Sequence, residues 1–324
     1  MKAIVVREHG GPEVLQFVDV PVPDPAADQV RVCIKAIGVN RRDAFVRAGI
    51  YPRALPLTPG IEASGVVDAV GAGVAGWAEG DRVVYYVPDV LGAYAEYQAV
   101  AAHRLVRLPQ ALSFQDAAAI FDHGLTAHYL STSTFPLRKG HRVLIHAAAG
   151  GVGSLLVQMA KRAGATVYGT VSTSEKSLLI KQIGSDESIL YRDADFVDAV
   201  KKFTGGEGVD VVYDSVGIDT IQGSLRCLKP RGTLVLYGQS SGEVTAINPA
   251  ALADAGSLFF TRPHLAHHIN TPEALRARSE DIFSWFLNGE ISVTINQVYS
   301  LANAADAHRR LDDRSCFGKI LLIP

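Results

Sequence analysis

A glycine-rich segment in the middle of the chain has the residue types and spacing of a phosphate-binding turn. The apolar run 142–146 leads into the small residues 147–153, and an amphipathic segment, 154–162, follows. This order predicts a strand, a tight turn and a helix. Gly150 would let the backbone approach a pyrophosphate, and Gly153 would let the helix pack on the strand. The helix N-terminus would offer unpaired N–H groups to the anion.

The turn departs from the dinucleotide-binding pattern at one position, because Ala148 stands where the pattern has glycine. An alanine keeps the turn small but weakens the match. Glycine-rich turns also occur in α/β proteins that bind no nucleotide. The turn therefore indicates a nucleotide site only together with the segments around it.

The segment that would contact the adenosine ribose carries no acid. The predicted strand 166–171 lies about twenty residues downstream of the turn, where an NAD-binding protein usually has Asp or Glu at the strand end. Here Val171 is followed by Ser172, Thr173, Ser174 and, two residues on, Lys176. Hydroxyls and an ammonium can donate to a 2′-phosphate. The sequence thus favours NADP(H) over NAD(H), although capping of the next helix would explain one of the hydroxyls.

Composition and length are those of a globular protein with two domains. The chain has 324 residues, 48% of them hydrophobic and 20% charged, with a net charge of −2. This charge predicts neither nucleic acid nor an anionic membrane as a partner. No apolar run reaches the length of a membrane span, and the N-terminus lacks a signal peptide's apolar core, so the expected location is the cytoplasm. The three cysteines, Cys33, Cys227 and Cys316, are too far apart for a disulfide framework or a CxxC metal site.

Hydrophobic patterning divides the chain into a β-rich part and an alternating part. Short β-branched runs at 2–6, 29–35, 65–70 and 81–85 predict an antiparallel barrel or sandwich. Ser113 and Asp116 resemble a capping box that opens a helical stretch. Predicted strands at 142–146, 166–171, 187–191, 209–214, 232–237 and 257–260 alternate with amphipathic segments, which indicates a parallel sheet covered on both faces. The tail, with strands at 296–299 and 319–323 and a helix at 302–311, is expected to return to the first domain.

Motifs spread over the whole chain resemble one enzyme family. They lie at residues 40–43, 47–51, 59–65, 80–83, 92–97, 124–127, 146–153, 212–217 and 321–324. The chain resembles the zinc-free quinone oxidoreductases of the zeta-crystallin type, in the medium-chain dehydrogenase/reductase superfamily. The resemblance implies an α/β protein with a GroES-like β-rich catalytic domain, residues 1–125 completed by 267–324, and a Rossmann domain with a doubly wound parallel sheet, residues 126–266. It also implies NADPH as cofactor and a homodimer. A long edge strand near 257–260 would fit such a dimer.

The residues at the family's zinc positions predict that no metal is bound. Zinc-dependent relatives have a cysteine at the position of Asn40, a histidine at Ile61, and a thiolate or acid near Asp122. An amide and an alkyl group cannot replace a thiolate and an imidazole as ligands. Residues 85–110, where relatives bind structural zinc, contain no cysteine. Without a Lewis acid the expected acceptor is one that takes a hydride readily, such as a quinone, an enal or an enone.

The resemblance also assigns roles to individual residues. Tyr51 would orient or protonate the acceptor, and Asn40 would act near the nicotinamide. The implied cofactor-binding residues are Asn40, Thr126, Gly150, Gly151, Val152, Ser172, Lys176, Tyr191, Ser215, Gly238, Gln239, Ser240, Phe260, Arg262 and Arg314. Of these, the resemblance assigns Ser172, Lys176, Tyr191 and Arg314 to the 2′-phosphate end of NADPH.

Several of these residues have structural alternatives. Tyr51 could be a packing residue of a loop, because a reduced quinone can take protons from water. Asn40 could cap a helix that starts at Arg41, with Asp43 in the same turn. Arg314 could pair with Asp312 or Asp313 on the surface. We interpret Glu62 as a structural residue that satisfies backbone donors or pairs with a base.

Two stretches depart from the family pattern. Asp122 and His123 precede Gly124 where relatives often have an apolar or amide residue with a lysine or glutamine, so the pocket floor could be polar or pH-responsive. The segment 263–268 holds His264, His267 and His268, but no acid or thiolate in register that would complete a metal site.

Three functions are compatible with the sequence. The first is an NADPH:quinone reductase with a small-molecule acceptor. The second is an NADPH-dependent reductase of α,β-unsaturated carbonyls, which would need a proton donor such as Tyr51. The third is a low-turnover NADPH-binding protein with a structural or RNA-associated role, and the near-neutral charge argues against RNA.

Overall fold

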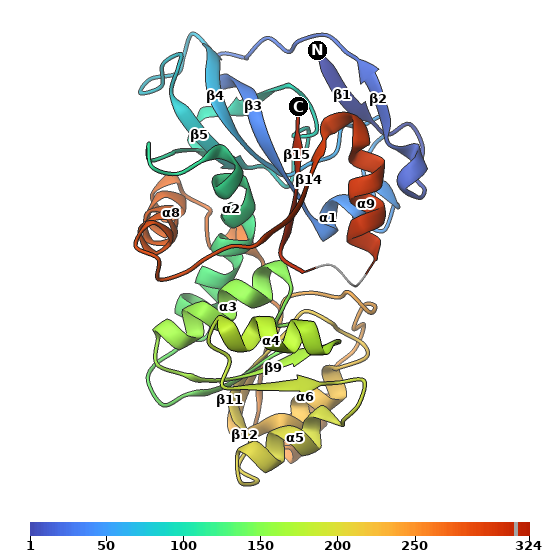
Figure 1. Cartoon of the computed structure of the whole chain (residues 1–324), viewed down its shortest axis with the longest axis vertical. Helices are drawn as coiled ribbons and strands as arrows, with labels where there is room; N and C mark the ends of the chain where they lie inside the picture. Colours follow the sequence, from blue (N-terminus) through green and yellow to red (C-terminus); the bar gives the residue numbers. More distant parts are fainter. Residues whose placement is uncertain (314–316) are drawn as a thin grey trace. The chain divides into compact units, whose positions relative to one another are not determined.

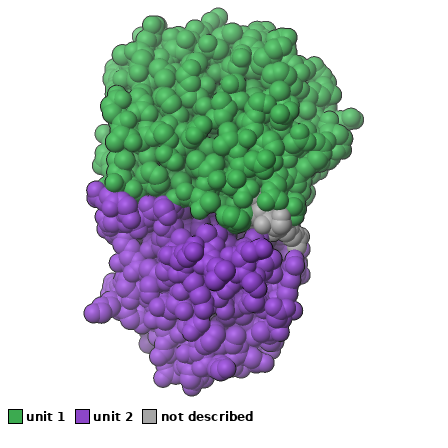
Figure 2. Space-filling view, in the orientation of Figure 1, with its two compact units in different colours: residues 1–123, 271–287, 293–324 green, residues 124–270, 288–292 purple. Residues whose placement is uncertain are grey.

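The computed structural model describes residues 1–313 and 317–324, which separate into two compact units. Unit 1 comprises Met1–His123, Thr271–Leu287 and Val293–Pro324, and unit 2 comprises Gly124–Asn270 and Asn288–Ser292 (Figure 2). The predicted domain boundaries placed residues 288–292 in the first domain, whereas in the structure Asn288–Ser292 belongs to unit 2. Arg314 and Cys316 lie outside the described residues.

The described residues of unit 1 form a seven-stranded sheet in the order β14-β15-β3-β4-β5-β7, with β6 also paired to β3 (Figure 1). All pairs are antiparallel except β14 with β15. The pairing of β15 with β3 confirms that the tail returns to the N-terminal part. The strands are β3 (Gln29–Val39), β4 (Glu62–Val70), β5 (Arg82–Tyr86), β6 (Tyr97–Ala101), β7 (Leu105–Arg107), β14 (Ile295–Ser300) and β15 (Lys319–Ile323), with β1 (Lys2–Val5) and β2 (Gln16–Asp19) as a separate pair.

Alternation along β3 builds the core of unit 1. Val30, Val32 and Ile34 are buried on one face and pack with the buried rings of Tyr85 and Tyr94. The four α-helices described here are α1 (Arg41–Arg47), α2 (Phe114–Tyr129), which continues into unit 2, α8 (Pro272–Leu287) and α9 (Ala304–Asp312). The short helical turns are η1 (Pro12–Val14), η2 (Ala102–Arg104) and η5 (Leu301–Asn303). The Ser113 hydroxyl accepts from the Asp116 N–H at 3.0 Å, so the predicted cap is confirmed.

The described part of unit 2 contains a six-stranded parallel sheet in the order β10-β9-β8-β11-β12-β13, which confirms the predicted parallel sheet (Figure 1). The strands are β8 (Arg142–Ile145), β9 (Thr166–Val171), β10 (Glu187–Leu190), β11 (Val209–Asp214), β12 (Leu228–Leu236) and β13 (Phe259–Thr261). The helices are α3 (Gly151–Arg162), α4 (Ser174–Gln182), α5 (Phe196–Phe203), α6 (Ile221–Cys227) and α7 (Pro249–Asp254), with the turns η3 (Leu130–Thr134) and η4 (Leu265–His267). The strand order reverses between β8 and β11. In open α/β sheets ligands bind at such a reversal, outside the carboxyl ends of the strands.

One prediction about this sheet was wrong. β13 is an edge strand as expected, but it has three residues rather than forming a long edge, because Gly256 and Ser257 both have positive φ and delay its start. Left-handed backbone cannot continue a ladder. Among the described residues, no helix combines the length and the hydropathy that crossing a bilayer would require.

Candidate functional site

The glycine-rich turn joins β8 to α3, and its one departure from the dinucleotide pattern is compensated locally. The left-handed residue of the turn is Ala147, with φ of +50°, rather than Ala148. Ala148 is fully buried, and its methyl group lies where β9 has no side chain: a Cβ built on Gly169 would be 2.8 Å from the Ala148 Cβ. A glycine in the neighbouring strand therefore makes room for the alanine in the turn.

The two glycines of the turn meet different surroundings. A Cβ on Gly153 would lie 2.4 Å from the Ala147 carbonyl oxygen and 3.0 Å from the Ala148 Cα, so the helix can approach the turn only without a side chain there. A Cβ on Gly150 would meet a single atom, the Ala147 oxygen at 3.1 Å. The requirement at Gly153 is packing, as predicted. Packing within unit 2 gives only a weak reason for glycine at position 150. The prediction that Gly150 lets a ligand approach the backbone is consistent with this.

A buried network of hydrogen bonds connects the ends of three strands near the turn. The sequence did not predict this network. His146 Nδ1 lies 3.0 Å from the Thr170 hydroxyl, and its Nε2 lies 3.0 Å from the Ser224 hydroxyl. Ser224 donates to Asp214 at 2.8 Å, and the same carboxylate accepts from the backbone N–H of Val216 at 2.8 Å. Burial lowers the pKa of His146. The neutral imidazole thus links the ends of β8, β9 and β11 by hydrogen bonds.

The predicted 2′-phosphate residues gather at the carboxyl ends of β9 and β10. Thr173 is the N-cap of α4 and accepts from the Lys176 N–H at 3.3 Å, so capping explains one hydroxyl and leaves Ser172. The Tyr191 N–H donates to the Val171 carbonyl at 3.2 Å, which brings the end of β10 beside that of β9. The fourth predicted residue, Arg314, lies outside the described residues, so its role stays a prediction.

The segment that follows β12 is in contact with the segment that follows β11. The Ser240 N–H donates to the Ser215 carbonyl at 3.1 Å, and a Cβ on Gly238 would lie 2.6 Å from the same oxygen. Phe260 and Arg262 lie at the end of β13 in the same sheet, and Thr126 lies on α2. All six strands thus bring predicted cofactor residues to the carboxyl edge of the sheet in unit 2. β11 does so through Ser215, which directly follows its end.

In unit 1 the predicted residue Asn40 belongs to a buried ionic cluster. Its side-chain amide donates to Glu62 Oε1 at 2.8 Å, and its amide oxygen accepts from Lys319 Nζ at 2.6 Å. Lys319 also forms an ion pair with Glu62, and both side chains are almost fully buried. Glu62 Oε2 accepts from the Asp122 N–H at 2.8 Å. The interpretation of Glu62 as a structural residue that pairs with a basic residue is confirmed, and that residue is Lys319.

The alternative role of Asn40 as a helix cap is confirmed for its backbone. Asn40 is the N-cap of α1, and its backbone N–H donates to the Asp43 carboxylate at 2.9 Å. Its side chain, in contrast, is fully used by Glu62, Lys319 and the Gly38 carbonyl. The amide oxygen, the one Asn40 side-chain atom that could ligate a metal, accepts from Lys319, and the neighbouring zinc position is the buried alkyl side chain of Ile61.

Acids around this cluster titrate near neutrality. Burial raises the pKa of Asp43 to about 7. Burial, together with the nearby Glu62 carboxylate, raises the pKa of Asp122 to about 7. Burial and the Lys319 ammonium lower the pKa of His123, whose Nε2 lies 3.5 Å from that ammonium and whose Nδ1 has no partner in the described part of the chain. The expectation of a polar, pH-responsive stretch at Asp122 and His123 is supported by these shifts.

Replacing Asp122 with asparagine should remove one source of pH dependence. A carboxyl with a folded pKa of about 7 against about 3.9 unfolded binds its proton more tightly in the folded protein. Its contribution to the free energy of unfolding is therefore present below about pH 4 and is lost as pH rises through about 7. The difference in Tm between D122N and wild type should be more positive at pH 8 than at pH 5, by calorimetry. The control is D28N at an exposed position; a pH-independent difference for D122N would contradict the assignment.

Tyr51 is held by two side chains of α1. Its ring packs edge-on against Phe45, with centroids 5.3 Å apart, and the Arg42 guanidinium carbon lies 5.6 Å from its centroid. The Tyr51 N–H donates to the Phe45 carbonyl at 3.2 Å. Within residues 1–313 and 317–324 its hydroxyl makes no hydrogen bond, so both the proton-donor role and the packing role stay predictions.

The histidines of residues 263–268 form hydrogen bonds and ring contacts within unit 2. His264 Nδ1 accepts from the Ala266 N–H at 3.3 Å, and His268 stacks on Tyr129 with centroids 4.3 Å apart. No group of three or more histidine, cysteine, aspartate or glutamate side chains in residues 1–313 and 317–324 is arranged to hold a metal.

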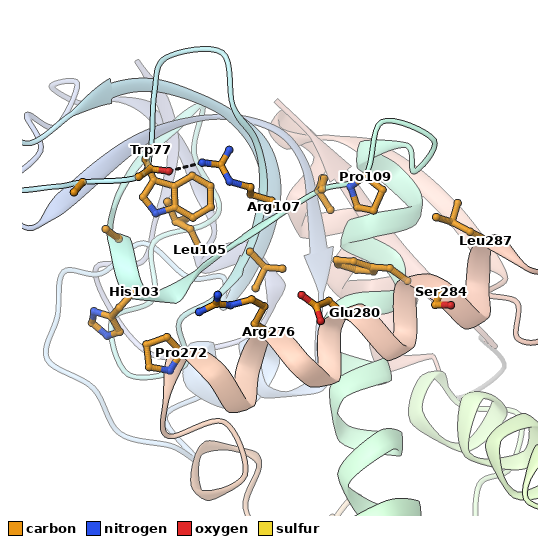
Figure 3. Close-up of a pocket in the computed structure, with 16 residues that line it drawn as sticks. Trp77, His103, Leu105, Arg107, Pro109, Pro272, Arg276, Glu280, Ser284 and Leu287 are labelled. Carbon is orange, nitrogen blue, oxygen red and sulfur yellow. Dashed lines mark hydrogen bonds between the residues drawn. The ribbon is translucent and has the colours of Figure 1, made fainter.

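A groove of about 900 Å³ lies in unit 1, between α8 and the segment around β7. Figure 3 shows Arg276 and Glu280 on α8 facing Trp77 and Arg107, whose guanidinium carbon lies 4.5 Å from the indole centroid. None of the residues discussed above for the cofactor or the acceptor lines it. The groove is therefore separate from the candidate site.

Comparison with known proteins identifies the family. A model described as the alcohol dehydrogenase GroES-like domain matches residues 26–110, and one described as zinc-binding dehydrogenase matches residues 151–276. Quinone oxidoreductase 1 of Escherichia coli is 45% identical over 324 residues, covering 99% of each chain. A 2-haloacrylate reductase of Burkholderia sp is 40% identical, covering 99% of this chain and 98% of the other.

The same relationship holds for solved structures. The Escherichia coli quinone oxidoreductase complexed with NADPH superimposes with a TM-score of 0.97 at 44% identity, covering 100% of both chains. The order of strands and the turn described above are thus those of a related enzyme of equal length. On sequence and fold together, the chain belongs to the quinone oxidoreductases of the medium-chain dehydrogenase/reductase superfamily.

Proposed function

We propose that this protein is an NADPH-dependent quinone reductase. The observation that carries the proposal is the carboxyl edge of the unit 2 sheet, where β9 ends without an acid and Ser172, Lys176 and Tyr191 gather beside a phosphate-binding turn. NADPH would supply a hydride from the nicotinamide, and with one proton from solvent a quinone becomes a hydroquinone. Relatives named as quinone oxidoreductases, one complexed with NADPH, support this reading.

We further propose that the reaction needs no zinc. The support is the chemistry of the donors: Asn40 is bound to Glu62 and Lys319, and Ile61 has no ligand atom. The buried Lys319 ammonium also places a positive charge in this cluster, where a divalent cation would be repelled. A quinone accepts a hydride without a Lewis acid because the resulting negative charge is delocalised onto oxygen.

The experiment that tests the proposal is the initial rate of NADPH oxidation with 9,10-phenanthrenequinone, before and after treatment with a chelator. We expect turnover that prefers NADPH to NADH and survives chelation. Tight NADPH binding without quinone turnover would reject the quinone assignment. Activity that is lost on chelation and restored by Zn²⁺ would reject the metal-free assignment.

Replacing Lys176 with alanine should reduce the preference for NADPH. A charge-assisted hydrogen bond to phosphate contributes about 1.5–3 kcal/mol, so kcat/KM for NADPH should fall at least about tenfold, whereas that for NADH changes little. The matched control is K181A on the same helix, where the lysine pairs with Glu187. Equal losses with both cofactors in K176A would show that Lys176 does not contact the 2′-phosphate.

A second activity, reduction of α,β-unsaturated carbonyl compounds, is favoured by two observations. The Tyr51 ring is held in place by Phe45 and Arg42, as a positioned proton donor would be. A relative of nearly equal length is named 2-haloacrylate reductase. We propose that Tyr51 gives a proton to the α-carbon after hydride addition at the β-carbon.

The variant Y51F separates the two activities. Loss of general acid catalysis should lower 2-alkenal reduction by about 10²-fold or more, while quinone reduction is retained because a hydroquinone takes its protons from water. NADPH affinity and Tm serve as controls for folding. If both activities persist in Y51F, Tyr51 is a packing residue and the proton comes from elsewhere.

A homodimer and a cytoplasmic location are also part of this proposal. The edge strand β13 leaves Phe259 58% exposed, and pairing of two such edges would cover it. Light scattering of wild type and F259K would test the dimer. We assign no RNA-associated role, because the net charge of −2 offers no basic surface to phosphates.

A further inference from the structure

Arg42 presents a cation to the ring of Tyr51. It is the second residue of α1, and its guanidinium carbon lies 5.6 Å from the centroid of the Tyr51 ring. The ring itself is fixed by the edge-on contact with Phe45 and by the backbone hydrogen bond between these residues. The charge of Arg42 and the candidate acceptor-binding residue Tyr51 therefore form one surface within unit 1.

The hydrogen-bonding capacity of Arg42 is almost unused. In the described part of the chain its side chain makes a single long hydrogen bond, from Nη2 to the Pro88 carbonyl at 3.4 Å. The Nε atom is buried and has no partner within residues 1–313 and 317–324. No ion pair of Arg42 with a carboxylate is recorded for this part of the chain. A guanidinium carries five N–H donors, so most of those of Arg42 make no hydrogen bond within the described residues.

Neighbouring arginines differ from Arg42 in this respect. Arg41 donates to Asp312 at 3.0 Å, and Arg47 donates to the same carboxylate at 3.1 Å. Two acids, Asp89 and Asp122, interact electrostatically with Arg42 but form no ion pair with it in the described part of the chain. Both oxygens of Asp89 are bound by Arg104 at 2.7 Å. Arg41, Arg47 and Arg104 thus each have a carboxylate partner, whereas Arg42 forms no ion pair within the part of the chain that the structure describes.

A partly buried guanidinium without a counter-ion is costly unless a ligand supplies the charge. Its planar fork fits a carboxylate with two parallel hydrogen bonds. We propose that Arg42 binds an anionic group of the acceptor, so that the preferred substrates are quinones or activated alkenes that carry a carboxylate. This inference rests on the proposed function and adds the substrate class. Tyr51 would contact the apolar body of the same substrate through its ring.

The test compares two acceptors that differ by one carboxylate group, 9,10-phenanthrenequinone and its 2-carboxylate. In R42L the ratio of kcat/KM for the carboxylate to that for the neutral quinone should fall at least about tenfold, the loss of one charge-assisted pair. The ratio carries the test rather than the absolute rates, because loss of the contact between Arg42 and the Tyr51 ring would affect both acceptors alike. R42K should keep part of the ratio, because it retains the charge without the fork.

The matched control is R53L. Arg53 is an exposed arginine two residues beyond Tyr51, and its recorded hydrogen bond is to the adjacent Pro52 carbonyl. It should leave the ratio unchanged, which excludes a general effect of net charge. An unchanged ratio in R42L would overturn the proposal, and an equal loss with both acceptors would show that Arg42 only positions Tyr51.

A binding measurement keeps this inference distinct from the proposed function. Phenanthrene-2-carboxylate cannot be reduced, so its affinity for NADPH-loaded protein is read by calorimetry without turnover. Wild type should bind it at least about tenfold more tightly than R42L does, even if no quinone proves to be a substrate. Equal affinities would reject the Arg42 site, whereas absent quinone turnover with unequal affinities would reject only the proposed reaction.

Discussion

Alanine at Gly153 is expected to destabilise unit 2, whereas alanine at Gly150 is expected to weaken cofactor binding with little change in stability. The methyl group at residue 153 would lie 2.4 Å from the Ala147 carbonyl oxygen, and that oxygen belongs to the backbone and cannot rotate away. Separating α3 from the turn should cost about 1–3 kcal/mol or more. A methyl group at residue 150 meets one atom at 3.1 Å, which a small shift relieves.

Calorimetry and NADPH titration distinguish the two glycines. G153A should lower Tm by about 2–4 °C for each kcal/mol lost. G150A should keep its Tm within a few degrees and raise the NADPH Kd at least about tenfold, because the methyl group stands where a pyrophosphate would approach. NADPH binding at wild-type affinity by G150A would remove Gly150 from the proposed cofactor site.

Replacing Lys319 with methionine should be among the most destabilising changes in unit 1. Methionine preserves the length of the side chain but leaves Glu62 as a buried charge without its base. Breaking a buried pair from one side costs about 3–5 kcal/mol. Lys319 also donates to the Asn40 amide oxygen, so that amide loses its fixed orientation. We expect a large decrease in Tm and in resistance to urea.

The double variant E62Q/K319M provides the control for this prediction. With both charges removed, no unpaired ion remains, and at least half of the lost stability should return. Glutamine can still accept from the Asp122 N–H, one of the contacts that Glu62 makes. If K319M is as stable as wild type, the pair does not carry the stability that its burial implies. If the double variant is less stable than K319M, the charge of Glu62 has another partner.

Local sequence patterns were sufficient to predict much of the fold. The strands β9, β11 and β15 have the predicted bounds, because alternation and bounding residues are properties of a few consecutive positions. The absence of an acid after Val171 and of zinc ligands at Asn40 and Ile61 is likewise visible in the sequence. The short β13 was not, because serine rarely adopts the positive φ that Ser257 has, so its residue type does not indicate where the strand starts.

The sequence did not allow us to predict which distant residues pair with each other. Lys319 lies 257 positions from Glu62, and no local pattern indicates that these two charges are buried together. The network of His146, Thr170 and Asp214 likewise depends on three strands arriving at one place. The residue after a strand can be read from the sequence, but its neighbour across the sheet cannot.

Residue types and their spacing determined the family, the nucleotide-binding turn, the favoured cofactor and the lack of zinc ligands, since each depends on which chemical groups are present at given positions. Only the tertiary structure decided that Gly169 accommodates Ala148, that Lys319 neutralises Glu62, and that Arg42 lies against the ring of Tyr51. The physical reason is that steric fit and the free energy of a buried charge depend on neighbours in space, and folding alone brings those neighbours together.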